Sequence, residues 1–252
     1  MAGKVSVGNV VFGEGRPKIC VPIVAETKEE IFAQAERVRT LPADLVEWRA
    51  DWFLQVTDEE ALNQVLAGLH NLLDALPLLF TFRTKAEGGA ADVSPADYVR
   101  LCKIAALSGI VSLVDVELFL GNVFVRDLVA FLKARGVKTV LSSHDFEKTP
   151  PKEEILRRLL SMEALGADLA KIAVMPQNGD DVLTLLSATL EANRRLSCPV
   201  ITMSMGKLGV ISRLAGETFG SCLTFGSAAQ ASAPGQIEVT QLSEILNLLR
   251  QS

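Results

Sequence analysis

Short apolar runs alternate with longer amphipathic stretches along the chain, after a predicted hairpin at Val5–Phe12. This alternation indicates parallel strands connected by crossover helices. The expected strands are Ile19–Ala25, Leu45–Arg49, Leu78–Arg83, Val111–Glu117, Val137–His144, Asp168–Met175, Val200–Met205 and Ser221–Phe225. The expected helices are Lys28–Arg39, Asp58–Leu76, Pro95–Ser108, Val123–Arg135, Lys152–Leu165, Asp180–Leu196, Val210–Gly216 and Gln241–Leu249.

Eight strands, each followed by a helix, predict an α/β fold of the closed (β/α)8 TIM barrel type with an N-terminal β-hairpin. The alternative is an open doubly wound sheet, which normally carries a glycine-rich nucleotide turn after an early strand. The segment Val24–Thr27 is not such a turn. A length of 252 residues is ordinary for one α/β barrel, and no linker interrupts the chain. We therefore expect a single domain over residues 1–252.

Composition argues against several classes of function. The formal charge is −5 and basic residues form no cluster, so we expect neither nucleic-acid binding nor attraction to a membrane. No apolar run is long enough to span a bilayer, and the first residues lack the apolar core of a signal peptide, so we expect a cytoplasmic protein. The cysteines have no paired spacing, which predicts reduced residues in or near the core and no zinc site: Cys20, Cys102, Cys198 and Cys222.

A single lysine, Lys171, interrupts the apolar pattern of the expected strand Asp168–Met175. A buried ammonium is costly unless it is paired or partly neutral. The preceding strand carries His144, and strands that follow one another in sequence usually lie side by side. A desolvated amine beside an imidazole suits imine chemistry on a carbonyl compound. The structural alternative is an internal ion pair that only holds the core together.

Polar residues recur on one face of several strands, because residues two apart in a strand point the same way. The pairs that share this face are Glu47 and Arg49, Thr81 and Arg83, Asp115 and Glu117, Ser142 and His144, and Met203 and Met205. Charged groups at the carboxyl ends of barrel strands predict a catalytic mouth.

Structural alternatives stay open for most of these groups. Glu47 could pair with Arg49, and Arg83 could pair with Glu87. Met203 and Met205 could be ordinary barrel filling. The second histidine, His70, lies on an amphipathic helix and is expected on the surface without a role.

Glycine-containing segments, Met203–Arg213 and Phe225–Gln236, follow the last two strands. In many barrels the corresponding loops bind phosphate, so an aldolase acting on a phosphorylated sugar is one possible function. Arg213 offers a planar fork that suits a carboxylate equally well. The small residues of Ser227–Gly235 are typical of a mobile lid, although an inert loop has the same composition.

Six segments, in order along the chain and each at the end of an expected strand, resemble type I 3-dehydroquinate dehydratase, an enzyme of the shikimate pathway. They are Glu47–Asp51, Phe80–Gly89, Ser142–Phe146, Lys171–Pro176, Met203–Arg213 and Ala231–Gln236. One departure concerns Pro22, which stands where some members of the family have a serine that faces the substrate.

The resemblance implies a lyase that converts 3-dehydroquinate to 3-dehydroshikimate by syn elimination of water through a lysine Schiff base. Lys171 would form the imine with the C3 ketone. His144 would transfer the protons, and Glu87 would orient His144. A barrel that binds the same ligand without catalysis is the remaining alternative of another class.

The resemblance also assigns residues to substrate binding. Arg213 would pair with the substrate carboxylate, and Glu47, Arg49 and Arg83 would position the ring hydroxyls. Ser232 and Gln236 would close over the ligand, and the walls of the site would come from Met203, Met205 and Phe225. No metal and no organic cofactor are implied, and a homodimer is expected.

Overall fold

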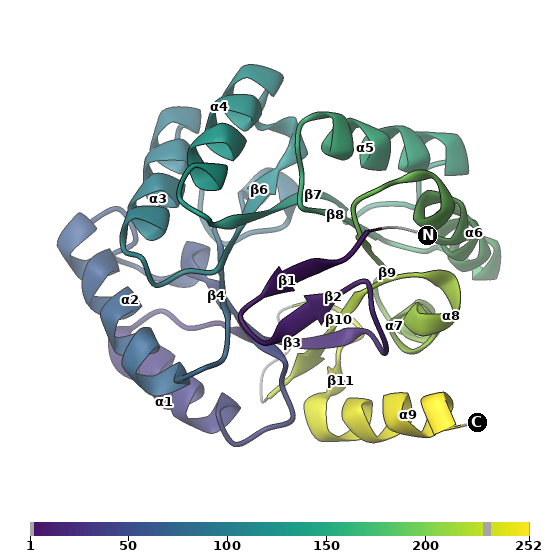
Figure 1. The fold of residues 1–252 in the computed structure, drawn as a ribbon, viewed down its shortest axis with the longest axis horizontal. Coiled ribbons are helices and arrows are strands. Elements are labelled where there is room, and N and C mark those ends of the chain that lie inside the picture. Colours follow the sequence, from purple (N-terminus) through teal and green to yellow (C-terminus); the bar gives the residue numbers. More distant parts are fainter. Residues whose placement is uncertain (1–2, 229–232, 252) are drawn as a thin grey trace.

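The computed structural model describes residues 3–228 and 233–251, and Figure 1 shows its arrangement. Within these ranges nine parallel strands form one curled sheet in the order β11-β10-β3-β4-β5-β6-β7-β8-β9. Their bounds are β3 (Lys18–Ile23), β4 (Leu45–Arg49), β5 (Leu78–Thr81), β6 (Leu113–Glu117), β7 (Lys138–Asp145), β8 (Leu169–Val174), β9 (Val200–Ser204), β10 (Leu223–Ser227) and β11 (Ile237–Glu238).

The ring of strands closes between β9 and β10. An isolated parallel bridge pairs Val200 with Ser221, and the Cys222 N–H donates to the Val200 carbonyl at 2.8 Å. The strands β3 to β10 therefore form the predicted eight-stranded barrel. The short β11 pairs with β10 outside this ring and had no counterpart among the expected strands.

Helices surround the barrel on its outer face (Figure 1). Their bounds are α1 (Lys28–Val38), α2 (Glu59–Leu73), α3 (Pro95–Leu107), α4 (Asn122–Lys133), α5 (Lys152–Ala164), α6 (Gly179–Arg195), α7 (Val210–Leu214), α8 (Gly216–Phe219) and α9 (Val239–Gln251), with the 3-10 turns η1 (Ala50–Trp52), η2 (Lys85–Glu87) and η3 (Leu118–Leu120). The expected helix Val210–Gly216 is in fact two short helices, because the backbone leaves the helical conformation at Ala215. Within the described ranges, none of the helices combines the length and apolar character that crossing a bilayer requires.

The N-terminal hairpin of β1 (Val5–Val7) and β2 (Val10–Phe12) closes one end of the barrel (Figure 1). Phe12 is fully buried. It packs with the apolar side chains at the first inward-facing positions of the strands, such as Leu45 and Leu113. The amino-terminal end of the barrel is thus filled with hydrocarbon, which leaves the carboxyl end for polar chemistry.

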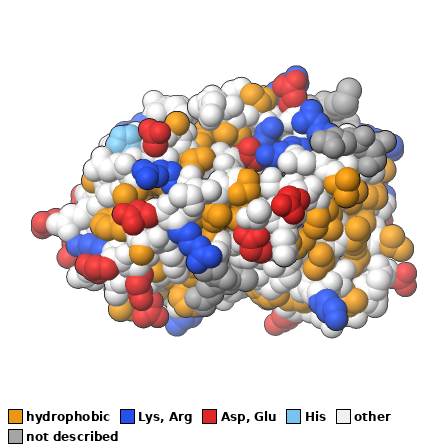
Figure 2. Space-filling view, turned by 90° about the horizontal axis from the view of Figure 1, so that it is seen from below, with side chains coloured by type: hydrophobic (Ala, Val, Ile, Leu, Met, Phe, Trp, Pro, Cys, Tyr) orange, Lys and Arg blue, Asp and Glu red, His pale blue; other side chains and the backbone are white. Residues whose placement is uncertain are grey.

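The alternation along the strands separates an outer core, against the helices, from an inner cluster inside the barrel. Outward residues such as Val46 and Trp48 pack against the helices, whereas Leu45 belongs to the inner cluster and Glu47 lies above it on the same face. The four cysteines are free and buried. Acidic and basic side chains are interspersed over the face shown in Figure 2.

Candidate active site

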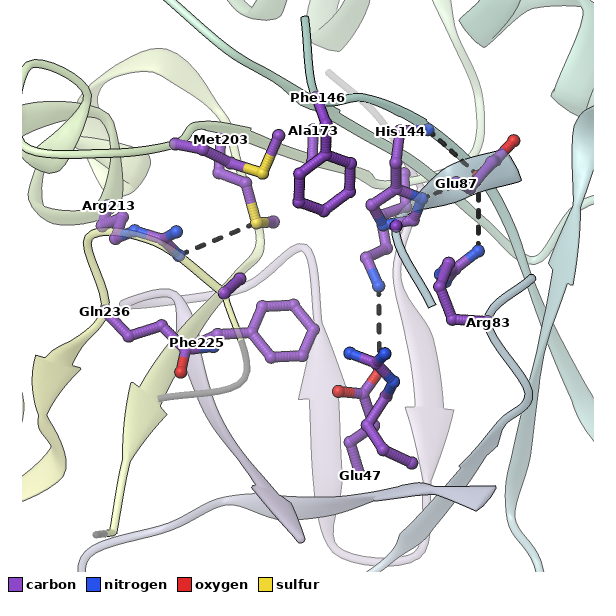
Figure 3. Close-up of a pocket in the computed structure, with 15 residues that line it drawn as sticks. Glu47, Arg83, Glu87, His144, Phe146, Ala173, Met203, Arg213, Phe225 and Gln236 are labelled. Carbon is purple, nitrogen blue, oxygen red and sulfur yellow. Dashed lines mark hydrogen bonds and ion pairs between the residues drawn. The ribbon is translucent and has the colours of Figure 1, made fainter. Parts of the chain in front are cut away.

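A cavity of about 470 Å³, counting its opening to solvent, lies at the carboxyl ends of the strands (Figure 3). It brings together every residue that the sequence predicted for catalysis or substrate binding, except Ser232, which lies outside the described residues. The lining also includes residues that were not assigned a role from sequence, namely Gly88, Phe146, Ala173 and Ala233. His70 is exposed on α2, away from this lining.

Lys171 projects from β8 and is only 3% exposed. Strand β8 pairs with β7, so that Lys171 lies opposite Ser142 and two residues below the level of His144. Its Nζ donates to Asp115 Oδ2 at 3.1 Å and lies 3.8 Å from Glu47 Oε1. The ring of Phe225 lies 4.8 Å from the same nitrogen. The lysine is therefore paired, as a buried ammonium must be, and it still lines the cavity.

His144 and Glu87 form a close pair. The imidazole Nδ1 lies 2.8 Å from Glu87 Oε2, and the His144 backbone N–H donates to the same oxygen at 3.1 Å. Burial lowers the pKa of His144 well below 6.5, with Arg83 and Lys171 acting in the same direction. Burial raises the pKa of Glu87 to about 8, although Arg83 opposes the shift. A neutral imidazole next to a carboxyl group of raised pKa is suited to proton transfer near neutral pH.

A tight turn after β5 carries Glu87 to His144. The turn η2 ends at Gly88, whose φ of 81° lies in the left-handed region. A Cβ at Gly88 would overlap the ring of Phe146, and one at Gly89 would overlap the Arg83 carbonyl. Only glycine fits these two positions without strain or displacement, which explains the local sequence that brings the carboxylate to the imidazole.

Arg83 is surrounded by carboxylates. Its guanidinium lies 2.8 Å from Asp115 Oδ1, 3.0 Å from Glu117 Oε1 and 3.4 Å from Glu87 Oε2. Burial alone would lower the pKa of Arg83, but these anions outweigh burial and raise the pKa well above its ordinary value. The predicted contact with Glu87 is present, yet the shorter contacts are to Asp115 and Glu117. Sequence alternation placed those two residues on the polar face without identifying their partner.

Arg49 pairs with Asp51 rather than with Glu47. Both hydrogen bonds of this bidentate pair are 2.8 Å long. Glu47 instead accepts a hydrogen bond from the Thr81 hydroxyl at 2.9 Å and stays within reach of Lys171. The sequence analysis considered a pair between Glu47 and Arg49. The structure does not form it.

Arg213 differs from the other cations of the cavity. Its guanidinium donates to the Pro234 carbonyl at 3.0 Å and contacts Met203 Sδ at 3.8 Å. Among the residues that the structure describes, no carboxylate lies within ion-pairing distance, and the buried Nε has no hydrogen-bond partner. Burial lowers the pKa of Arg213 to about 10. This is the arrangement expected of a cation that binds an anionic ligand.

Two further positions complete the comparison with the sequence. Gln236 lines the cavity as expected. Pro22 pairs in register with Glu47, on the strand next to it. Over residues 3–228 and 233–251, no group of three or more His, Cys, Asp or Glu side chains is placed to hold a metal ion.

Comparison with known proteins gives a consistent result. The family model described as Type I 3-dehydroquinase matches residues 19–252. The chain is 49% identical over 253 residues to "3-dehydroquinate dehydratase" of Clostridioides difficile (strain 630), covering 100% of this chain and 99% of the relative. It is 52% identical over 248 residues to "3-dehydroquinate dehydratase" of Listeria monocytogenes serotype 4a (strain HCC23), covering 98% of each.

Solved structures agree. The crystal structure of type I 3-dehydroquinate dehydratase from Clostridium difficile with covalently modified comenic acid has a TM-score of 0.97 at 49% identity, over 100% of this chain and 99% of that one. The 3-dehydroquinate dehydratase from Geobacillus kaustophilus HTA426 has a TM-score of 0.95 at 42% identity, over 98% and 96%.

Proposed function

The chain belongs to the type I 3-dehydroquinase family, and from that premise we propose that it dehydrates 3-dehydroquinate through a Schiff base on Lys171. The observation that carries the proposal is the position of this buried lysine in one cavity with the His144–Glu87 pair. This reaction requires a nucleophilic amine, a proton-transfer pair and a cation for the substrate carboxylate. Arg213 can serve as that cation, because it has no carboxylate partner among the described residues.

In the first stage, the neutral amine of Lys171 attacks the C3 ketone to give a carbinolamine, which loses water and becomes an iminium ion. His144 assists both steps by giving a proton to the departing oxygen and taking one from nitrogen. The iminium then withdraws electrons from the C3 carbon, which makes the adjacent C2 hydrogen acidic.

In the second stage, His144 removes the C2 proton and returns a proton to the C1 hydroxyl as the C–O bond breaks. Because one imidazole serves both positions, the proton and the hydroxyl leave from the same face, which is a syn elimination. The depressed pKa of His144 supports its role as the base, because the imidazole is neutral when the step begins. Water finally hydrolyses the product imine and frees Lys171.

The remaining residues orient the ring. Arg213 pairs with the substrate carboxylate through its planar fork, which the lack of a described carboxylate partner supports. Glu47, Arg49 and Arg83 position the ring hydroxyls. The apolar walls come from Met203, Met205 and Phe225, and Gln236 lines the same cavity. Ser232, which lies outside the described residues, and Gln236 are proposed to contact the ligand, as the family resemblance implies.

Borohydride reduction in the presence of 3-dehydroquinate, followed by peptide mass mapping, tests the proposal. We expect the mass of a reduced adduct on Lys171 and no adduct in Lys171→Met. The exposed Lys207, two residues after Met205, serves as the internal control, since it should stay unlabelled. A label on Lys207, or dehydration without any label, would reject the imine mechanism.

The assembly and location of the protein are also proposals. We infer a homodimer, as the family resemblance implies, in the cytoplasm, as the composition predicts. Light scattering coupled to gel filtration should give twice the chain mass of 27.1 kDa. A particle of one chain mass at working concentration would contradict the dimer.

A further inference from the structure

Asp115 is the most completely engaged carboxylate around Lys171. It lies on β6, its side chain has no exposed surface, and it does not line the cavity. One oxygen, Oδ2, accepts from Lys171 Nζ at 3.1 Å. The other, Oδ1, accepts from the Ser142 hydroxyl at 2.6 Å and lies 2.8 Å from Arg83 Nη2. The carboxylate is therefore held in one orientation from three sides.

Asp115 is the hydrogen-bonding partner of the lysine nitrogen, but other groups also face that nitrogen. They are Glu47 of β4 at 3.8 Å, the ring of Phe225 of β10 at 4.8 Å, and His144 of β7 and Cys20 of β3 at longer range. Arg83 shares the Asp115 carboxylate with the lysine. Glu47 lines the cavity and is available to substrate, whereas Asp115 contacts Lys171 without lining the cavity. The two acids therefore differ in what they can contact.

We propose that Asp115 is the positioning residue of the imine step: it directs Lys171 Nζ toward the cavity and stays ionised as the fixed counter-ion of that nitrogen. This inference rests on the proposed Schiff-base function. It assigns to Asp115 a role in charge and orientation, and it leaves proton transfer to His144 and Glu87.

The charge balance of imine formation explains why a fixed anion matters. The lysine ammonium and the ketone give an iminium and one water molecule, with the C–N bond formed, the C–O bond broken and two nitrogen-bound protons leaving in the water. The nitrogen carries a positive charge at both ends of this sequence and is neutral in between. A fixed anion at 3.1 Å stabilises both charged ends and opposes the neutral amine.

Asp115 is a poor acceptor for the proton that the ammonium must lose. Burial alone would raise the pKa of Asp115, but Arg83, Lys171 and the Ser142 hydroxyl outweigh burial and lower it. Its oxygens are already occupied, and the side chain has no access to the cavity. The anion therefore persists through the cycle.

The test is the pH dependence of adduct formation in Asp115→Asn, which keeps the size of the side chain and an oxygen for Ser142. The rate of borohydride-trapped adduct is measured from acid to alkaline pH with 3-dehydroquinate. Without its counter-ion, Lys171 should react at lower pH, with a half-maximal rate displaced by about 1–3 pH units. Affinity for the substrate analogue with an alcohol at C3, which cannot form an imine, should be unchanged.

Glu117→Gln is the matched control. Glu117 is similarly buried and pairs with the same arginine at 3.0 Å, but it accepts its other hydrogen bonds from Thr84 rather than from Lys171. Its pH dependence should match that of the wild type even if its rate falls. An equal displacement in both variants, or a displacement found only in Glu47→Gln, would overturn the assignment to Asp115.

A second variant covers the case in which Asp115→Asn does not fold. Ser142→Ala removes the hydroxyl that donates to Oδ1 and leaves that oxygen with Arg83 alone, so adduct formation should slow while affinity for the alcohol analogue stays the same. An unchanged adduct rate in that variant would overturn the positioning role. If the wild type itself gives no adduct on Lys171, the proposed function fails; if it does, and Asp115→Asn has the same pH profile, only this inference fails.

Discussion

The two halves of the cavity differ in the partners of their buried arginine. We call the side with Arg83, Glu87 and His144 the paired half, and the side with Arg213, Met203 and Gln236 the open half. Figure 3 shows His144, Glu87 and Arg83 on one side and Arg213, Met203 and Gln236 on the other. In the first half, Arg83 lies within 3.4 Å of three carboxylates. In the second half, the described residues provide Arg213 with a carbonyl and a thioether as partners.

The difference indicates that the charge of Arg83 is compensated within the protein, whereas the charge of Arg213 needs an anion from a ligand. Neighbouring anions raise the pKa of Arg83, whereas burial lowers the pKa of Arg213 to about 10. A paired cation fixes the geometry of the catalytic groups around it. A buried cation without an anion lowers the stability of the free protein. A ligand carboxylate removes this penalty when it binds, and the energy regained strengthens binding.

The largest expected effect is in the paired half. Replacing His144 with Ala should reduce turnover on the order of 10²–10⁴-fold, the usual contribution of a positioned acid–base group. The adduct on Lys171 should still form, more slowly, and should accumulate, because proton removal comes after imine formation. Single-turnover mass spectrometry measures both quantities, and full activity in His144→Ala would remove this residue from the mechanism.

The two halves should also differ in how much their arginine contributes to the free energy of unfolding. Arg83→Met leaves Asp115 and Glu117 without their shared cation and should cost about 3–5 kcal/mol of unfolding free energy. Arg213→Met removes a cation that has no described carboxylate partner, so the stability should be equal or higher. Urea denaturation of both variants measures the contrast. An equal loss of unfolding free energy in both variants would mean that the charge of Arg213 is compensated as well as that of Arg83.

The role of Arg213 in the open half can be tested through substrate recognition. Arg213→Lys keeps the charge but loses the planar fork, so the KM for 3-dehydroquinate should rise about tenfold or more, the worth of a hydrogen bond to a charged group. Turnover at saturation should change less than KM. Steady-state kinetics decides this, and an unchanged KM would show that the carboxylate binds elsewhere.

The dependence of stability on pH should be localised in the paired half. Glu87 has a pKa of about 8 in the folded chain and 4.5 as its ordinary value, so the folded chain holds the extra proton between these values and stability falls as pH rises through them. The lowered pKa of His144 has the opposite effect, but only up to 6.5. From pH 6.5 to 8 the wild type should therefore lose stability, and Glu87→Gln should lose less. Identical slopes in chemical denaturation would contradict the assignment.

Glu87→Gln should also affect catalysis. An amide cannot gain or lose a proton, whereas Glu87 titrates with a pKa of about 8 next to His144, so turnover should fall and its pH profile should change. An unchanged pH–rate profile would break the proposed pair, whatever the stability data show.

The smallest expected effect concerns closure over the open half. Gln236→Ala should weaken substrate binding modestly and leave the adjoining segment sensitive to protease when ligand is present. In the wild type the ligand should protect it. Limited proteolysis measures this difference, and equal cleavage of the wild type with and without ligand would show that the segment is an inert connection.

The sequence by itself determined the strands, most of the helices and the face on which chemistry occurs. Period-2 alternation and capping signals are local properties, so they are legible from a single chain. They identified Lys171 and His144 and placed them on neighbouring strands, as the pairing of β7 with β8 confirms. Helix ends were less well predicted: α2 begins at Glu59, after Asp58, whose side chain accepts from the Ala61 N–H, and ends at Leu73, three residues before the expected end.

Only the tertiary structure decided which charges meet. Arg83 reaches the hydroxyl of Ser142 across 59 residues of sequence, and His144 reaches Glu87 across 57. Such contacts depend on how the barrel closes and how its loops turn, and no local pattern contains that information. Arg49 therefore pairs with Asp51 rather than with Glu47, and Asp115 pairs with Lys171. The physical reason is that residue spacing fixes the direction of a side chain, whereas its partner is fixed by the distance between strands that are remote in sequence.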